Sequence, residues 1–301
     1  MQLLLPDSLS VERAAAFRIS SSGALSLKFD YDHDRNLTVV RLLEQRPPLK
    51  LVRAFAAGAG AALIHLHNIS GGVLGGDELQ FEFEIEPCAR AQITSTGATR
   101  LYRSRVDRGP ARCSSLVRVR ENALLEYLPD PLIPFAGSRY YQDVKIELDA
   151  GAGLFWWEIV APGREAHGEA FAFDEMRLAL KITAEGIPIA IERARLEPAA
   201  YPVTSLARLG AYRYWSSFYI CRAGTEAGIW EALEAELIEL SQQLSHSPVI
   251  IWGLSRLPAH GLILRALSSN GREIASGLVA FWRAAKKTLY GQAAVIPRKV
   301  Y

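Results

Sequence analysis

Residues 78–86, with the sequence ELQFEFEIE, contain the pattern that decides the fold. Four apolar side chains, from Leu79 to Ile85, alternate there with five polar ones. In an extended segment, successive side chains project to opposite faces, so the apolar groups all lie on one side. The stretch therefore predicts a long strand with one buried face and one solvated face.

The same alternation continues on both sides of this strand. It recurs in residues 25–31, 117–120, 143–149 and 177–182. Short turn-forming sequences rich in glycine and proline separate these segments. Consecutive strands with short connections favour a mainly β fold of stacked or sandwiched, antiparallel-rich sheets over alternating βαβ units.

The last third of the chain changes to a helical period. From Thr225, the expected cap, apolar residues recur every three or four positions up to Leu244. A second helical pattern begins at Asn270, a favourable capping residue, and ends before Gly291. We expect two C-terminal α-helices, with a pair of strands between them at residues 249–252 and 262–264.

No long polar or glycine-rich linker divides the sequence into separate folding units. We therefore expect a single domain over residues 24–301. Its β body covers residues 24–224 and its helix-containing part covers residues 225–301. Residues 1–23 carry no recognisable pattern and are interpreted as an N-terminal extension.

Composition and charge limit the kinds of function. The chain has 301 residues, with 34 Lys or Arg and 32 Asp or Glu, and a net charge of +2. A charge so near zero creates no field that would attract nucleic acid or an anionic membrane surface. The three cysteines include no Cys-x-x-Cys pair, which indicates a reducing compartment. Because no signal peptide or membrane-spanning run is recognised either, we expect a cytoplasmic protein.

A glycine-rich stretch, residues 71–77 (GGVLGGD), lies directly before the strand described first. A phosphate-binding loop is one interpretation, but the Gly-Lys-Ser/Thr ending is missing and a strand follows instead of a helix. We prefer a tight turn at the start of the strand, because glycine permits conformations that side chains forbid. Asp77 would then either cap this turn or point inward.

Polar side chains within apolar stretches are the candidate functional groups. Glu158, Glu192 and Thr99 each lie in such a stretch. A carboxylate in a dry wall is costly unless it is paired or meets water or a cation. Several such groups together favour an internal polar path. For each acid alone, an ion pair with Arg100, Arg164 or Arg193 is an equally good interpretation.

Two histidines, His65 and His67, are a possible metal contact. In an extended segment they project to the same face and could supply two ligands. The sequence nearby offers no third ligand. The other interpretation is two polar positions at the edge of a strand.

Several motifs occur in order along the chain. They are residues 71–79 (GGVLGGDEL), 93–104 (ITSTGATRLYRS), 125–131 (LEYLPDP), 157–164 (WEIVAPGR) and the Pro297-Arg298 ending. Their characteristic residues are Gly71, Gly72, Gly75, Gly76, Arg100, Tyr102, Arg103, Ser104, Gly163, Arg164, Gly168 and Glu169. Together these motifs resemble the UreD (UreH) family of urease accessory proteins.

The resemblance implies a non-catalytic protein with β-helix-like stacked sheets of many short strands and two helices near its C-terminus. It also implies a complex with UreF and with UreG, a nickel-carrying GTPase, which docks on apo-urease. An internal tunnel would carry Ni²⁺ in transit, with no permanently bound cofactor. By motif position, the tunnel lining would be Asp77, Thr99, Glu158 and Glu192.

Weak oxygen contacts suit such transit, because they attract a cation without trapping it. The transient contacts implied by the resemblance are the acids Asp77, Glu158 and Glu192. The resemblance also implies that the C-terminal segment, with Trp282, Pro297 and Arg298, contacts UreF.

Two other functions stay open from the residues themselves. One is an all-β carbohydrate-active enzyme in which Glu158 and Glu192 act as acid and base, about 5–10 Å apart. The other is a scaffold that carries no metal.

Overall fold

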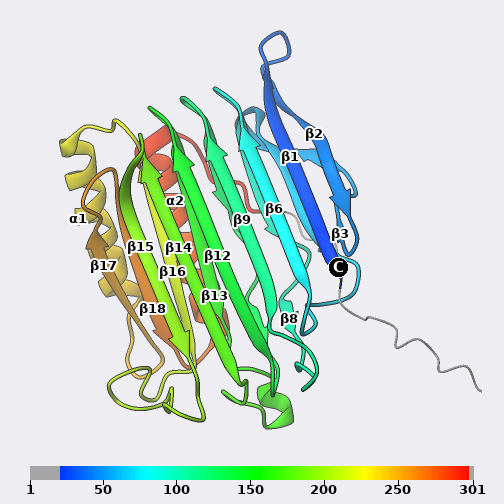
Figure 1. Cartoon of the computed structure of the whole chain (residues 1–301). Coiled ribbons are helices and arrows are strands. Elements are labelled where there is room, and N and C mark those ends of the chain that lie inside the picture. Colours follow the sequence, from blue (N-terminus) through cyan, green and yellow to red (C-terminus); the bar gives the residue numbers. More distant parts are fainter. Residues whose placement is uncertain (1–20, 298–301) are drawn as a thin grey trace, which may run out of the picture.

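Two stacked sheets form the body of the protein, with two helices behind them (Figure 1). The computed structural model describes residues 21–297. Most of the predicted N-terminal extension, residues 1–20, and Arg298 therefore lie outside the described residues. Ser22 and Gly23, which were assigned to the extension, belong to the first strand.

The seven-stranded sheet, called the front sheet here, faces the viewer in Figure 1. Its strands in spatial order are β15 (Ile187–Leu196), β14 (Glu175–Ala184), β12 (Arg139–Leu148), β9 (Ala111–Val119), β6 (Glu78–Ile85), β1 (Ser22–Asp32) and β2 (Leu37–Arg46). The alternating stretch at residues 78–86 is thus confirmed as a strand, in the middle of this sheet.

The eleven-stranded sheet, called the back sheet, lies behind it. Its main path is β17 (Ile250–Arg256), β18 (Gly261–Ser268), β16 (Tyr214–Arg222), β13 (Gly153–Val160), β10 (Leu124–Tyr127), β7 (Arg90–Ser95), β5 (Ala62–Asn68) and β3 (Leu49–Lys50). Three short strands join its margin: β4 (Ala54–Ala56), β8 (Thr99–Leu101) and β11 (Leu132–Pro134).

The chain alternates between the two sheets as it proceeds. It passes through β6, β9, β12 and β14 in the front sheet, and through β7, β10 and β13 in the back sheet between them. Neighbouring strands within each of these sets are parallel, because the chain passes through the other sheet between them and enters each sheet in the same direction every time. The stacked, β-helix-like architecture is confirmed. The expectation of antiparallel-rich sheets is wrong for this central coil, and holds for pairs toward the ends such as β1–β2 and β14–β15.

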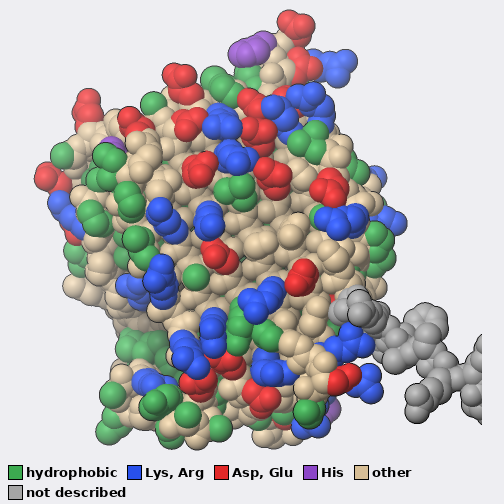
Figure 2. Space-filling view, viewed as in Figure 1, with side chains coloured by type: hydrophobic (Ala, Val, Ile, Leu, Met, Phe, Trp, Pro, Cys, Tyr) green, Lys and Arg blue, Asp and Glu red, His purple; other side chains and the backbone are tan. Residues whose placement is uncertain are grey.

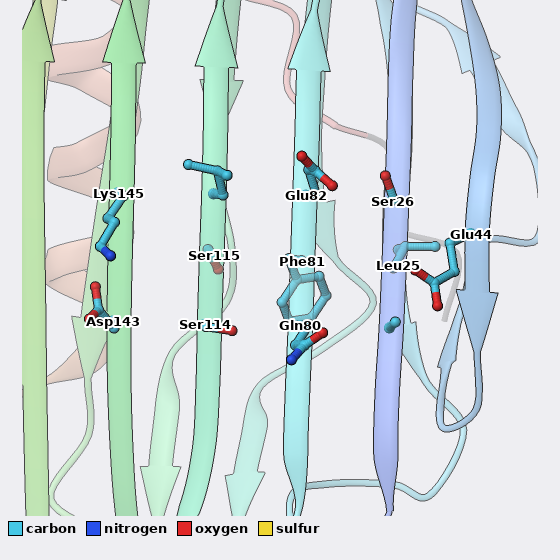
Figure 3. Close-up of a pocket in the computed structure, with 12 residues that line it drawn as sticks. Leu25, Ser26, Glu44, Gln80, Phe81, Glu82, Ser114, Ser115, Asp143 and Lys145 are labelled. Atoms are coloured by element: carbon cyan, nitrogen blue, oxygen red, sulfur yellow. The ribbon is translucent and has the colours of Figure 1, made fainter. Parts of the chain in front are cut away.

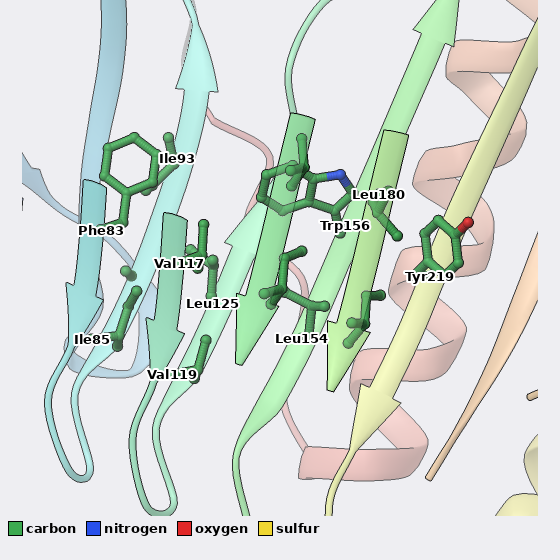
Figure 4. Close-up of a cluster of buried hydrophobic side chains, with 14 of the residues drawn as sticks. Phe83, Ile85, Ile93, Val117, Val119, Leu125, Leu154, Trp156, Leu180 and Tyr219 are labelled. Atoms are coloured by element: carbon green, nitrogen blue, oxygen red, sulfur yellow. The ribbon is translucent and has the colours of Figure 1, made fainter. Parts of the chain in front are cut away.

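The main core lies between the sheets (Figure 4). Phe83 and Ile85 from β6 are fully buried there, as the alternation predicted. Val117, Leu154 and Trp156 continue the apolar layer across both sheets. Burial of apolar side chains from every coil provides the main stabilisation of the stack.

Helices α1 (Ala227–Leu244) and α2 (Gly271–Tyr290) pack on the outer face of the back sheet and form a second core with it. Asn270 caps α2 through its side chain, which accepts the Arg272 N–H. Both predicted helices and the strand pair β17–β18 between them are confirmed. The predicted cap Thr225 is wrong, because α1 has Glu226 at its N-cap, without a side-chain hydrogen bond.

Within residues 21–297, neither helix combines the length and the apolarity that a membrane crossing requires.

Candidate functional site

The glycine-rich loop packs directly against the second motif. The Val73 N–H donates to the Arg100 carbonyl at 2.8 Å, and the Tyr102 N–H donates to the Val73 carbonyl at 2.8 Å. A Cβ at Gly72 would lie 2.5 Å from the Tyr102 ring and 2.6 Å from the Arg100 carbonyl oxygen. Only glycine permits this approach. The tight turn that the sequence favoured is present, and it is followed by β6.

Asp77 caps this turn. Its carboxylate accepts the backbone N–H groups of Ser21 and Leu74, each at 2.9 Å. The side chain is 1% exposed and is not among those lining the two cavities described below. Its hydrogen bonds account for its burial without a cation.

The other motif residues hold neighbouring loops together. Glu169 accepts hydrogen bonds from the Arg164 guanidinium and from the Ala136 N–H, and these bonds lower the pKa of its carboxyl to about 2. The Ser104 hydroxyl accepts the Arg139 N–H at 3.1 Å. Two motif glycines make close contacts, Gly75 against Ser104 and Gly163 against Glu169, and Gly137 outside the motifs lies against Arg103.

Behind these loops, a cavity of about 310 Å³ lies between the two sheets. We call it the inner cavity. Its walls are apolar on many sides, with Leu79 and Phe81 from β6 among them. Its polar lining includes His67, Asn68, Thr99, Arg100, Cys113, Tyr140, Gln142 and Glu158. The structure thus brings Thr99, His67 and Glu158 to one space.

Glu158 projects into this space from β13. Its carboxylate accepts a hydrogen bond of 2.6 Å from the Gln142 side chain. No Lys, Arg or His in residues 21–297 forms an ion pair with it, so the arginine partners weighed from the sequence do not neutralise it. Burial raises the pKa of Glu158 to about 7, while the Gln142 hydrogen bond opposes the rise and the charge of Glu192 adds to it.

A second, smaller cavity of about 30 Å³ continues from Glu158. Glu158, Glu192, Trp215 and Ser217 line it. The volume suits a water molecule or a small ion. Glu158 therefore belongs to both cavities, and it connects the inner cavity to Glu192.

Glu192 lies on β15, the strand at the edge of the front sheet. It accepts hydrogen bonds from the Tyr219 hydroxyl and, at 3.2 Å, from the Arg265 guanidinium. Burial raises the pKa of Tyr219 well above its ordinary value, and the nearby Glu192 charge adds to the rise. Tyr219 therefore keeps its proton and acts as the donor.

Strand register explains why these groups meet. Glu158 pairs with Ser217 of β16, and Ser217 pairs with Arg265 of β18. Directly opposed residues on neighbouring strands share a face. Glu158, Ser217 and Arg265 thus form one cross-strand row, called the polar row here, which ends beside Glu192.

The two histidines lie on β5 near the inner cavity. His67 lines it, and its pKa is lowered by burial and by the nearby His65 and Lys50. His65 is buried and meets the edge of the Phe55 ring, with 5.6 Å between ring centroids. Among the residues that the structure describes, no group of three or more His, Cys, Asp or Glu could hold a metal ion. A resident metal centre is therefore not found in this part of the chain.

A separate polar cluster lies under α2. The Lys286 ammonium pairs with Glu126 of β10 at 2.9 Å, and the Trp282 indole N–H donates to the same carboxylate at 2.8 Å. The Gln92 amide links this cluster to the C-terminal segment by donating to the Val295 carbonyl at 3.1 Å. Trp282 is fully buried, so a partner could reach it only after α2 moved. Pro297 is the last described residue.

The outer face of the front sheet carries mixed charges (Figure 2). Many are in cross-strand ion pairs, for example Arg118 with Glu82 and Glu147. A hollow of about 310 Å³ on this face is bordered by short polar groups such as Ser114 and by Lys145 (Figure 3). Charges of both signs border it, and it gives no reason to favour one ligand.

Comparison with known proteins identifies the family. The UreD urease accessory protein family matches residues 21–301. The chain belongs to the UreD family. Its UreD relatives include a urease accessory protein UreD from Herpetosiphon aurantiacus, 44% identical over 93% of this chain and 96% of the relative. Another, from Nostoc punctiforme, is 31% identical over 85% of this chain and 88% of the relative. The resemblance drawn from the motifs is confirmed.

Within the UreD fold, the enzyme interpretation fits the geometry poorly. A glycosidase needs its two carboxylates on either side of the substrate bond. The space that Glu158 and Glu192 share is only about 30 Å³, far below the several hundred Å³ of an ordinary ligand pocket. The relatives are also named as accessory proteins.

Several residues of this site were not identified from the sequence. Gln142 and Arg265 sit in alternating stretches as ordinary polar positions, and Tyr219 sits in an aromatic run. Their roles depend on which strands are neighbours, which local patterns do not reveal. Glu126 and Lys286 gave a usable signal, because each is a charge within an apolar face.

Proposed function

We propose that this UreD-family chain is a non-catalytic scaffold of urease maturation, which passes Ni²⁺ through its interior toward apo-urease. In this proposal it acts in the cytoplasm, in a complex with UreF and UreG, and holds no permanent cofactor. Family membership supports the role in urease maturation. Passage of the ion and the partners are our inference.

One observation carries the proposal. Glu158 is a half-buried carboxylate without a cation partner among the described residues, and two adjoining cavities share it. A buried acid normally has a counter-charge or full hydrogen bonding. Here the carboxylate lines a space in which a divalent cation could supply that charge.

The donor set agrees with transit better than with storage. Along the route, oxygen donors come one or two at a time, from Thr99 to Glu158 and then to Glu192. Ni²⁺ is held firmly by several ligands, with imidazole among the favourable ones. Here one imidazole, that of His67, and single carboxylates line the route, a set small enough to attract the ion and release it.

The test is urease maturation in cells that lack the native protein, supplied with variants of this chain. We expect Glu158→Gln to lower nickel per urease about tenfold, the scale seen when a metal-site contact is removed. The matched control is Glu147→Gln, which changes an exposed acid on the front sheet. Capture of UreF by the same variant measures assembly separately.

The outcomes discriminate between the candidate roles. If Glu158→Gln captures UreF but matures urease normally, the chain is a scaffold without metal traffic. If the native chain does not capture UreF at all, the proposed complex is wrong. Deletion of residues 297–301 tests the proposed UreF contact at Pro297 and Arg298, and normal capture by that variant would exclude it.

A further inference from the structure

The Glu192 end of the route is occupied by a guanidinium. Arg265 Nη2 lies 3.2 Å from Glu192 Oε2, and the Tyr219 hydroxyl donates to the same oxygen. Both donors bind the same oxygen, and the guanidinium beside it supplies the positive charge that a cation would otherwise provide. Glu158, at the other end of the small cavity, accepts the neutral amide of Gln142 on Oε1 and forms no ion pair with a described residue. The two carboxylates therefore differ in charge balance, because Glu192 is paired with a guanidinium and Glu158 is not.

The exposure of this ion pair indicates which group can move. The Arg265 side chain is 55% exposed and Glu192 is 34% exposed. A long, half-solvated arginine can rotate into water, because its guanidinium is hydrated outside the pair and the pair is weak. Tyr219 is buried in the core and cannot follow it.

We propose that Arg265 closes the Glu192 end of the route, so that a cation reaches Glu192 only when the Arg265–Glu192 ion pair is broken. The inference rests on the proposed function and adds its control. The guanidinium and the metal compete for the negative charge of one carboxylate, and each repels the other. A carboxylate on a protein docked beside Glu192 would break the ion pair and open this end of the route, because it offers Arg265 another partner.

Trp215 provides a local reporter, because it lines the small cavity with Glu192. Ni²⁺ quenches tryptophan fluorescence at short range. The Trp215 signal of the full chain is obtained by subtracting the signal of a Trp215→Phe variant made in each background. We expect Arg265→Gln to raise Ni²⁺ quenching of Trp215 about two- to fivefold, the change in ratio that an exposed ion pair supports.

The chain offers a matched control. Arg256 on the adjacent strand also pairs with a glutamate, Glu234, and its side chain is 53% exposed. Arg256→Gln should leave Trp215 quenching unchanged, and Arg265→Lys should restore most of the closure because it keeps the charge. Adding Glu192→Gln to Arg265→Gln should abolish the increase, since the carboxylate that receives the ion is gone.

Equal quenching in Arg265→Gln and the native chain would overturn the proposal, and so would an equal rise in Arg256→Gln.

If Arg265→Gln does not fold, salt provides the test in the native chain. At roughly 1 M NaCl, where screening acts within about 3 Å, acrylamide quenching of Trp215 should rise, and no rise would refute closure by the ion pair. Normal urease maturation with Glu158→Gln would refute the proposed route itself. Unchanged Trp215 quenching in Arg265→Gln would refute only the proposed closure of the route by Arg265.

Discussion

Glu126 and Glu158 are carboxylates on neighbouring strands of one sheet, yet their surroundings are opposite. Glu126 faces the helices, is 2% exposed, and meets both an ammonium and an indole N–H. Glu158 faces the other sheet, meets one amide, and borders two cavities. The first arrangement neutralises a buried charge within the protein. The second leaves a charge that something outside the chain must neutralise.

This difference teaches how a buried acid can be assigned to structure or to function. Closed hydrogen bonding and a counter-ion indicate a structural role, because the protein alone meets the cost of burial. A shifted pKa beside free volume indicates a group poised for a proton or a cation. Three substitutions test this contrast, and the expected effects decrease from the first to the last.

The largest effect is expected at the closed cluster. Lys286→Ala should lower the free energy of unfolding by about 3–5 kcal/mol, because it leaves Glu126 charged and buried without its partner. Chemical denaturation of the purified chain measures this loss. Lys287→Ala, which changes the exposed neighbouring lysine on the same helix, is the control. A loss below 1 kcal/mol, on the scale of an exposed ion pair, would show that Glu126 does not depend on Lys286.

Substitution of Glu158 should change the free energy of unfolding in the opposite direction. Because burial raises the pKa of Glu158 to about 7 from an ordinary 4.5, ionisation costs more in the folded chain than in the unfolded one. The stability that the protonated carboxyl provides is present below about pH 4.5 and is lost as pH rises through 7. Glu158→Gln should therefore stabilise the fold by about 1–3 kcal/mol at pH 8 and leave it nearly unchanged at pH 4.

Urea unfolding of the native chain and the Glu158→Gln variant at the two pH values measures this difference. Equal stability of both at pH 8 would mean that the Glu158 carboxylate is as well solvated as one on the surface. Glu147→Gln again serves as the exposed control and should show no such dependence on pH.

The smallest effect is expected on the outer face of the front sheet. Arg118, which is half-buried, pairs with the exposed Glu82 at 2.8 Å and with the exposed Glu147 at 3.4 Å. Arg118→Ala should change the free energy of unfolding by no more than about 0.5 kcal/mol, because water screens these pairs. A thermal scan suffices as the measurement. A much larger loss would remove the distinction between surface and interior pairs in this fold.

The sequence allowed much of the fold to be predicted, because its signals were local. Alternation from Leu79 to Ile85 identified β6, and apolar spacing after Asn270 identified α2. The expected antiparallel pairing failed for the central coil, because nothing in a strand's own residues says which sheet the next strand joins.

Prediction of the site was less complete for the same reason. Glu158, Glu192 and Thr99 stood out as polar groups in apolar surroundings, and the structure places them at the two cavities. Asp77 stood out equally, yet its carboxylate is used by backbone N–H groups of a turn. The partners Gln142, Tyr219 and Arg265 come from strands far apart in the chain, so only the register reveals them.

The alternating visits to two sheets have a consequence for how this protein can vary. Loops between coils can grow or shrink without changing which side chains stand opposite one another, since pairing is set within the strands. A single residue inserted into or deleted from β13 would have a different result, because every later side chain of that strand would turn to the other side. After an insertion, Trp157 would replace Glu158 between the sheets, and its indole would fill the junction of the two cavities; after a deletion, Ile159 would take that place. The polar lining at the junction of the two cavities thus depends on the number of residues in one strand.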